Sequence, residues 1–131
     1  MDSKGATSAA LLDALPPKAR ERLLKNTKRR TYAAGDAIVH EGDSALYLYI
    51  VDTGHGRIEQ VDRGVVGRFG PGDFFGELAL LDQGDRTATV IAEDELTCYL
   101  IPAWEFRALL HEHPAMAIPM LHKVIARLHG R

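Results

Sequence analysis

The sequence predicts a mainly β fold with flanking helices: an antiparallel β-roll, similar to a jelly-roll barrel, with one N-terminal helix and two C-terminal helices. Over about residues 31–101, short runs of strand-forming residues alternate with turn residues; the runs are AIVHE, ALYLYIVD, GRIEQV, VVGRF, ATVIA and LTCYLI. Many short strands at near-regular spacing are typical of antiparallel barrels. Glycines separate them, at Gly35, Gly42, Gly54, Gly56, Gly64, Gly67, Gly70, Gly72, Gly76 and Gly84.

Prolines and apolar spacing predict the helices on either side of the β region. Pro16 and Pro17 suit a helix start, because proline at the first helical position loses no needed hydrogen bond, and we expect a helix over about residues 17–25. After Pro102 the helical period returns, which predicts C-terminal helices over about residues 103–131. The first ten residues are small and polar, and we expect them to be frayed. Residues 11–131 then form a single domain.

Two apolar faces define the C-terminal helices. The first helix places Phe106, Leu109 and Leu110 on one face. The second carries a stripe made of Ile118, Leu121, Val124, Ile125 and Leu128. This stripe is compatible with packing on the barrel, on a ligand or on a second subunit, and equally with a plain amphipathic docking helix. Pro119 either begins this helix or kinks it, and Pro114 and Pro119 are candidate hinge points.

Composition excludes several classes of protein. The chain has 131 residues, 46% hydrophobic and 26% charged, with a net charge of −2, which fits a globular protein without a global attraction to nucleic acid or anionic membranes. The basic cluster KNTKRR (Lys25 to Arg30) is interpreted as a solvated helix end. A single cysteine, Cys98, excludes an internal disulfide and is expected to be a buried, inert thiol. No apolar stretch approaches a membrane span and no signal peptide is recognised, so we expect a cytoplasmic protein.

The segment FGELALLDQGDRTATV holds the candidate chemistry. Gly76 permits a tight backbone close to a ligand, and a helical turn beginning there leaves N–H groups that bind anions. The carboxylate of Glu77 would accept hydrogen bonds from a sugar hydroxyl. Arg86, nine residues later, carries a rigid fork of donors that can grip two phosphate oxygens. Together they describe a sugar phosphate with a hydroxyl beside it, although Glu77 and Arg86 could instead form an ion pair that ties a loop to the barrel.

The same segment closely resembles the phosphate-binding cassette of cyclic nucleotide-binding domains, as found in protein kinase A regulatory subunits, cyclic-nucleotide-gated channels and bacterial catabolite activator proteins. The resemblance extends to YAAGDAIVHEGDSALYLYIVDTGHGRIE, to FGPGDFFGE and to IPAWEFRALLHEHP. It covers about 110 residues, from the first helix to the C-terminus, and the spacing between the glutamate and the arginine equals that of the kinase-type cassette.

The resemblance implies a role for each residue of the cassette. Glu77, with Gly76 making room, would bind the ribose 2′-hydroxyl. Arg86 would pair with the exocyclic oxygens of the cyclic phosphate. The remaining phosphate contacts would come from the cassette backbone and its small residues, at Gly76, Leu78, Ala79, Thr87 and Ala88. The base pocket would be formed by Ile58, Val66, Phe69, Thr87 and Leu128, although Ile58, Val66 and Phe69 are each equally compatible with barrel core.

Two positions bear on the preference and strength of binding. In the family a hydroxyl just after the arginine can favour cGMP, yet relatives with the same RTA sequence accept both nucleotides, so Thr87 does not decide between cAMP and cGMP. Thr87 could also satisfy a local backbone group. Many relatives have proline where this chain has Asp85. A carboxylate there would weaken anion binding unless it points into solvent.

The resemblance implies a sensor that is not an enzyme and needs no cofactor or metal. It would bind cAMP or cGMP and relay occupancy, through movement of its C-terminal helices, to an effector protein or an effector domain outside this chain. A homodimer through the last helix is compatible with the apolar stripe. The chain ends without room for a helix-turn-helix, so we expect no direct contact with nucleic acid. We expect no membrane span either, because no apolar stretch is long enough.

Three alternatives remain at this stage. The chain could be the sensor domain of a catabolite-activator-type regulator that responds to another ligand, or a protein-interaction domain with a vestigial nucleotide site. It could also be a metal-dependent enzyme on a similar barrel, which requires converging histidines and carboxylates. Only His40 and His55 lie in the β region, which disfavours a metal site.

Overall fold

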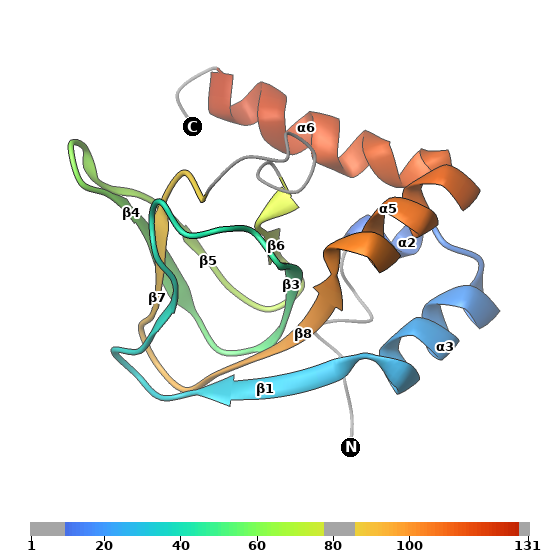
Figure 1. Ribbon diagram of the computed structural model, residues 1–131, viewed down its shortest axis with the longest axis horizontal. Helices are drawn as coiled ribbons and strands as arrows, with labels where there is room; N and C mark the ends of the chain where they lie inside the picture. The colour runs from blue at the N-terminus through green and yellow to red at the C-terminus, as the bar shows by residue number, and fades with distance from the viewer. Residues whose placement is uncertain (1–9, 78–85, 129–131) are drawn as a thin grey trace.

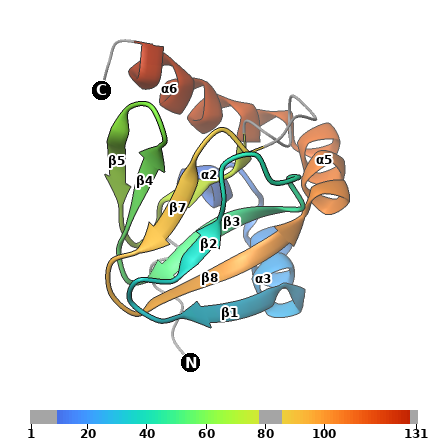
Figure 2. The ribbon, with the colours of Figure 1, turned by 60° about the vertical axis from the view of Figure 1, so that its left-hand side comes forward.

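The computed structural model describes residues 10–77 and 86–128, and its centre is a pair of four-stranded antiparallel sheets (Figure 1). One sheet has the strand order β1-β8-β3-β6, and the other has the order β2-β7-β4-β5. Figure 2 shows β4, β5 and β7 on one side of the roll and β1 and β8 on the other. The strands are β1 (Lys28–Tyr32), β2 (Ala37–Val39), β3 (Tyr47–Thr53), β4 (Gly56–Gln60), β5 (Gly64–Phe69), β6 (Phe74–Phe75), β7 (Thr89–Ala92) and β8 (Leu96–Pro102). The predicted antiparallel β-roll is confirmed.

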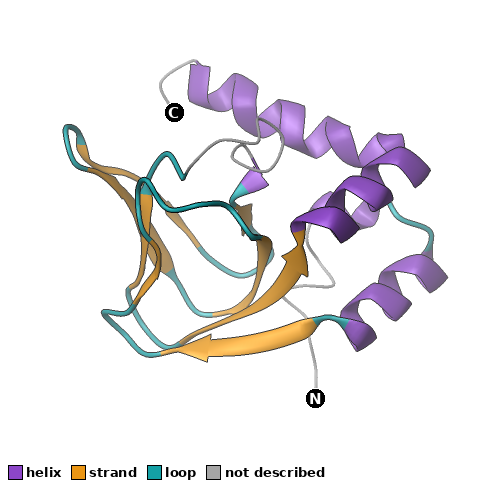
Figure 3. Ribbon diagram, in the orientation of Figure 1, coloured by secondary structure: helices purple, strands orange, loops and turns teal. Residues whose placement is uncertain are grey.

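Helical segments gather on one side of the roll (Figure 3). They are α2 (Ala10–Asp13), α3 (Pro17–Asn26), α5 (Ala103–Glu112), the 3-10 turn η1 (Pro114–Met116) and α6 (Ala117–Leu128). Pro17 occupies the first position of α3, as predicted. Pro119 lies in the first turn of α6, where its missing N–H removes no bond within the helix, so this proline marks the helix start and not a kink.

The sheet β1-β8-β3-β6 is covered on both faces, and this explains its apolar strands. Side chains alternate along a strand, so Leu48 and Ile50 of β3 join a core shared with the helices. Tyr49 and Val51 of the same strand join a second core between the two sheets. With both faces buried, the strand cannot show the polar alternation of a half-exposed strand. The continuous runs ALYLYIVD and LTCYLI follow from this arrangement.

Three features of the N-terminal half differ from the sequence interpretation. The cluster KNTKRR is only in part a helix end, because α3 stops at Asn26 and Lys28 begins β1, which pairs with β8. The β region therefore starts three residues earlier than expected. An extra helix, α2, precedes α3 and buries Leu11 and Leu12 completely. Tertiary burial of these leucines stabilises a helix of only four residues, which is too short to be stable alone.

The C-terminal helices use one face each for packing. Phe106 of α5 is fully buried, and Leu109 and Leu110 pack beside it, as the apolar spacing predicts. In α6 the inward residue is Met120, which is 4% exposed. The predicted stripe instead points largely to solvent, since Ile118 is 54%, Leu121 56% and Ile125 49% exposed. Of the arrangements left open for the stripe, packing on the barrel is therefore not the one found for Leu121 and Ile125.

Cys98 lies in β8 with no exposed surface and is a reduced thiol, as expected. Burial, and to a lesser degree the nearby Asp52, raises the pKa of this thiol to about 12. Because the thiolate is the reactive form, Cys98 is chemically inert at neutral pH. In the part of the chain that the structure describes, no helix has the length and apolar character needed to cross a bilayer.

Candidate ligand-binding site

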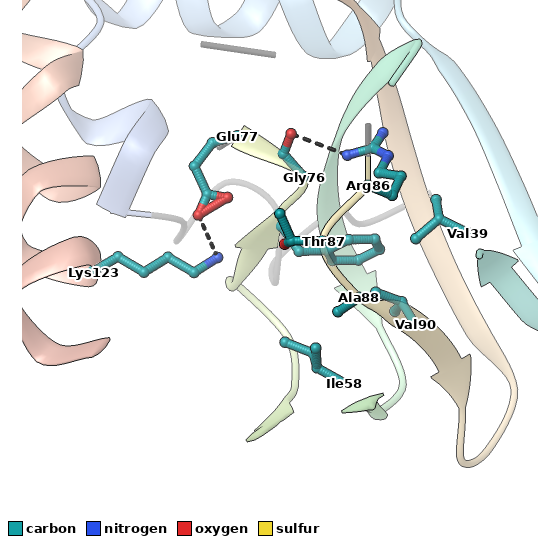
Figure 4. A pocket seen from close by; sticks show the side chains of 10 residues that line it. Val39, Ile58, Gly76, Glu77, Arg86, Thr87, Ala88, Val90 and Lys123 are labelled. Carbon is teal, nitrogen blue, oxygen red and sulfur yellow. Dashed lines mark hydrogen bonds and ion pairs between the residues drawn. The ribbon is translucent and has the colours of Figure 1, made fainter. Parts of the chain in front are cut away.

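A hollow at the open end of the roll, beneath α6, brings the two charged cassette residues together (Figure 4). It is small, about 50 Å³, and adjoins a larger hollow of about 440 Å³ with which it shares Ile58, Thr87, Ala88 and Lys123. Together they reach the size range of small-molecule sites, about 300–1,000 Å³. The smaller hollow is lined by Val39, Ile58, Phe75, Gly76, Glu77, Arg86, Thr87, Ala88, Val90 and Lys123.

Backbone and side-chain contacts hold Arg86 in this hollow. Its N–H donates to the carbonyl of Asp43 at 2.7 Å, and its own carbonyl accepts from the N–H of Gly42 at 2.8 Å. Its guanidinium donates to the carbonyls of Gly76, at 3.0 Å, and Tyr47, at 2.6 Å. These bonds fix a charged group that is only 5% exposed.

Burial sets the electrostatics of Arg86. Desolvation lowers the pKa of its guanidinium, while the nearby Tyr49 and Glu77 act in the opposite direction. The guanidinium carbon lies 5.6 Å from the centre of the Tyr49 ring, in cation–π range. Arginine remains protonated in proteins, so the hollow holds a fixed, poorly solvated positive charge. Its Nε–H is buried and has no hydrogen-bond partner among the described residues.

Gly76 is required at its position by backbone geometry and by space. Its φ of +94° lies in the left-handed region that side chains with a Cβ rarely adopt. A Cβ there would lie 2.4 Å from Nη1 of Arg86 and 3.2 Å from the carbonyl oxygen of Tyr47. The glycine therefore makes room for the guanidinium, in addition to the room for a ligand that the sequence suggested.

Glu77 is the second charged residue of the hollow and the first residue after Gly76 with helical conformation. It is 2% exposed. Lys123 of α6 approaches it, with Nζ 3.1 Å from Oε1. The pair meets the distance of an ion pair, but Oε1 accepts no well-directed hydrogen bond from any described residue. Lys123 also donates to the carbonyl of Phe74, and its ammonium lies 4.4 Å from the centre of the Phe74 ring.

The suggested Glu77–Arg86 ion pair is therefore not the arrangement found among the described residues. Arg86 bonds two carbonyls, and Glu77 faces Lys123. Figure 4 shows the guanidinium and the carboxylate on different sides of Gly76. Arg86 and Glu77 therefore do not pair with each other. Among the described residues, Nε–H of Arg86 and Oε1 of Glu77 are a buried donor and a buried acceptor that lack a well-directed hydrogen bond.

The other predicted site residues fall into three groups. Thr87 and Ala88 line both hollows, and the carbonyl of Thr87 accepts a hydrogen bond from the amide of Gln60 at 3.1 Å. Ile58 and Val66 line the larger hollow, whereas Phe69 is 9% exposed and packs on Phe75 in the core between the sheets. Outside the described residues, or without a described side chain, are Leu78, Ala79, Asp85 and Leu128.

Sequence reasoning missed Lys123. The apolar stripe that the sequence analysis emphasised lies on the opposite face of the last helix from Lys123. A usable signal was present, because residues at spacings of three and four share a helix face, and Met116, Met120 and Lys123 have that spacing. A lysine in line with two buried methionines indicates a charge directed towards the interior.

The described residues include no group of three or more His, Cys, Asp or Glu side chains that could hold a metal ion. The alternative of a metal-dependent enzyme thus gains no support from this part of the chain. What the fold and the hollow define is a β-roll binding module with a fixed cation, a buried carboxylate and an apolar wall.

Comparison with known proteins identifies the module. The family model described as "Cyclic nucleotide-binding domain" matches residues 29–113, and the chain belongs to this family. The cyclic AMP receptor protein of Thermus thermophilus is 31% identical over 111 residues, which are 82% of this chain and 51% of that protein. The cAMP-dependent protein kinase regulatory subunit of Blastocladiella emersonii is 34% identical over 104 residues, covering 76% of this chain and 26% of the subunit.

Solved structures agree with the sequence comparison. The crystal structure of the Thermus thermophilus catabolite activator protein superposes with a TM-score of 0.78 and 29% identity, over 91% of this chain and 58% of that one. The chain thus spans about half the length of the bacterial relative and about a quarter of the kinase subunit.

Proposed function

We propose that this chain is a non-enzymatic sensor that binds a cyclic mononucleotide, cAMP or cGMP, in the hollow beneath α6. The observation that carries the proposal is a pair of buried groups on one hollow, Nε–H of Arg86 and Oε1 of Glu77, neither of which forms a well-directed hydrogen bond among the described residues. A buried polar group without a hydrogen bond is costly, so a ligand that bonds to Nε–H of Arg86, and that gives Oε1 of Glu77 a better directed hydrogen bond than Lys123 does, gains affinity from both. A cyclic nucleotide offers an anionic acceptor and a ribose hydroxyl donor a few ångströms apart.

Each part of the nucleotide has a proposed partner. Arg86 binds the cyclic phosphate, assisted by Gly76, Thr87, Ala88 and the backbone of residues 78–79. Glu77 accepts the hydrogen bond of the ribose 2′-hydroxyl. The base lies in the larger hollow against Ile58 and Val66, with Leu128 as the proposed cover. Phe69 supports this wall from the core. The family assignment and the names of the relatives, a cyclic AMP receptor protein and a cAMP-dependent kinase subunit, support this class of ligand.

Occupancy is relayed, in this proposal, by α6. The helix carries Lys123 into the hollow on one face and an exposed apolar stripe on the other, so it can transmit a change from the ligand to a partner. The partner is an effector protein, an effector domain outside this chain, or a second copy bound through the stripe. Hydrogen exchange across residues 114–131 should then differ with and without nucleotide, and equal exchange would remove the relay.

Isothermal titration of the purified chain with cAMP, cGMP and non-cyclic 5′-AMP tests the binding proposal. We expect saturable binding of at least one cyclic nucleotide and much weaker binding of 5′-AMP. Arg86→Gln should weaken binding by about 2–5 kcal/mol, because it removes the charged partner of a buried anion. Arg20→Gln is the control, since α3 contributes no residue to the lining of the hollow. Absence of binding to both cyclic nucleotides refutes the proposal.

A second titration needs no mutation and so cannot be confused with misfolding. The wild-type chain is titrated with the 2′-deoxy analogue of whichever nucleotide binds. The analogue should bind at least about tenfold more weakly, because the buried carboxylate of Glu77 loses its donor. Equal affinity for the two ligands removes Glu77 from the proposed ribose site.

A further inference from the structure

Lys123 of α6 extends across the hollow to the carboxylate that we assign to the ribose (Figure 4). Its side chain is 27% exposed, whereas that of Glu77 is 2% exposed. The lysine also lines the hollows on either side, one bounded by Arg63 and Val65 and another bounded by Arg68 and Phe69. Lys123 therefore stands at the junction of all three hollows of the site.

We propose that Lys123 is a latch: it neutralises Glu77 when the site is empty, and a nucleotide binds only by displacing the ammonium from this carboxylate. The ligand half of this inference rests on the proposed function, whereas the ion pair itself does not. The carboxylate of Glu77 thus contacts Lys123 of α6 when the site is empty and a ribose hydroxyl when nucleotide is bound.

The charge balance of the hollow supports the latch. An ionised carboxylate as deeply buried as Glu77 needs a compensating charge, and Lys123 is its ion-pair partner among the described residues. A ribose hydroxyl supplies a hydrogen bond to the Glu77 carboxylate but does not neutralise its negative charge. Displacement of the Lys123 ammonium therefore has a free-energy cost that opposes ligand binding. The affinity measured for the nucleotide is then lower than the intrinsic affinity of the open hollow.

The bonding geometry makes displacement feasible. Although Nζ of Lys123 lies 3.1 Å from Oε1, that oxygen accepts no well-directed hydrogen bond within residues 10–77 and 86–128. The ammonium donates instead to the carbonyl of Phe74. An incoming hydroxyl can therefore form a better directed bond to Oε1 than the lysine does. Because Lys123 belongs to α6, its displacement also loosens the contact between the middle of this helix and the roll.

The latch predicts an effect opposite to that of losing an ordinary binding residue. Lys123→Met keeps the apolar stem and removes the charge, so it should tighten nucleotide binding by at least about fivefold, the lower end of typical coupling between two sites. The same variant should melt at a lower temperature than the wild type when no nucleotide is present. Lys25→Met, on α3, is the matched control and should change neither quantity. Unchanged or weaker nucleotide binding by Lys123→Met overturns the proposal.

A double-mutant cycle without nucleotide tests the ion pair separately. Lys123→Met, Glu77→Gln and the double variant are compared by thermal unfolding. Loss of the lysine should lower the melting temperature in the wild-type background and have little effect beside Glu77→Gln, because the buried charge is then absent. Additive effects refute the pair, and with it the latch.

The two tests together separate the latch from the proposed function. If the wild type binds no cyclic nucleotide but Lys123→Met does, the proposal that the wild-type chain is a sensor fails, whereas the latch is supported in its strongest form. If the wild type binds and Lys123→Met binds no better, the latch is wrong and the proposed function stands. If neither protein binds a cyclic nucleotide, the proposed function fails and the ligand half of the latch fails with it.

Discussion

Replacement of Gly76 by alanine tests how the hollow holds its fixed cation. A residue with a Cβ at a φ of +94° destabilises the folded state by about 1–2 kcal/mol. The added Cβ would also lie 2.4 Å from Nη1 of Arg86, so the guanidinium must move and lose its bond to the Gly76 carbonyl. A hydrogen bond from a charged donor contributes about 1.5–3 kcal/mol. Gly76→Ala should therefore lower the free energy of unfolding by about 2.5–5 kcal/mol and weaken nucleotide binding at least tenfold.

Gly35→Ala is the matched control for this experiment. Gly35 has a φ of +91°, but nothing lies within 4 Å of the Cβ that alanine would add. It carries the same backbone strain without a clash, so urea unfolding should show a loss of only about 1–2 kcal/mol, with unchanged nucleotide affinity. If Gly76→Ala proves no more destabilising than Gly35→Ala, the alanine is accommodated without moving Arg86 and the reasoning is wrong.

Two further predictions concern the helix surface and the buried acids. If a second copy binds the exposed stripe of α6, light scattering should show a dimer for the wild type and a monomer for Leu121→Glu. Val61→Glu, at a 92% exposed position outside the stripe, is the control and should remain a dimer. A wild-type chain that is monomeric at high concentration would contradict dimerisation through the stripe. Burial raises the pKa of Cys98 from 9.0 to about 12 and that of Tyr49 from 10.0 to about 12. The unfolded chain releases these protons first, so the free energy of unfolding should fall as pH rises from 9 to 12, by up to about 1.4 kcal/mol per pH unit and group. Cys98→Ala should flatten the decline between pH 9 and 10 in urea titrations, and an unchanged slope would refute the assignment.

Much of the fold was predictable because its signals are local. The helix predicted over residues 17–25 is Pro17–Asn26, fixed by two prolines and a short apolar face. The strand runs coincide with β2, β3, β4, β5, β7 and β8 within a few residues. Two strands were not predicted. β1 is rich in charged residues, and its strand conformation comes from pairing with β8. β6 has only two residues and depends on its pairing with β3.

The candidate site was predictable where it depends on residue type and not where it depends on distant contacts. Glycine, glutamate and arginine at fixed spacing identified Gly76, Glu77 and Arg86, which line one hollow. The partners of these residues come from elsewhere in the chain. The carbonyl of Tyr47 lies 39 residues before Arg86, and no sequence pattern marks a carbonyl as an acceptor. Lys123 meets Glu77 only because α6 folds back over the roll.

The two phenylalanines of β6 point into different cores, Phe74 towards the helices and Phe75 between the sheets. Inserting one residue just before Gly76 would turn each of these side chains to the opposite face of the sheet, since a register shift of one residue has that effect on every side chain of a strand. The exposed turn between β4 and β5, at residues 61–63, imposes no such restriction on its length. Natural variation in chain length should therefore accumulate at this turn and be absent from the approach to the cassette.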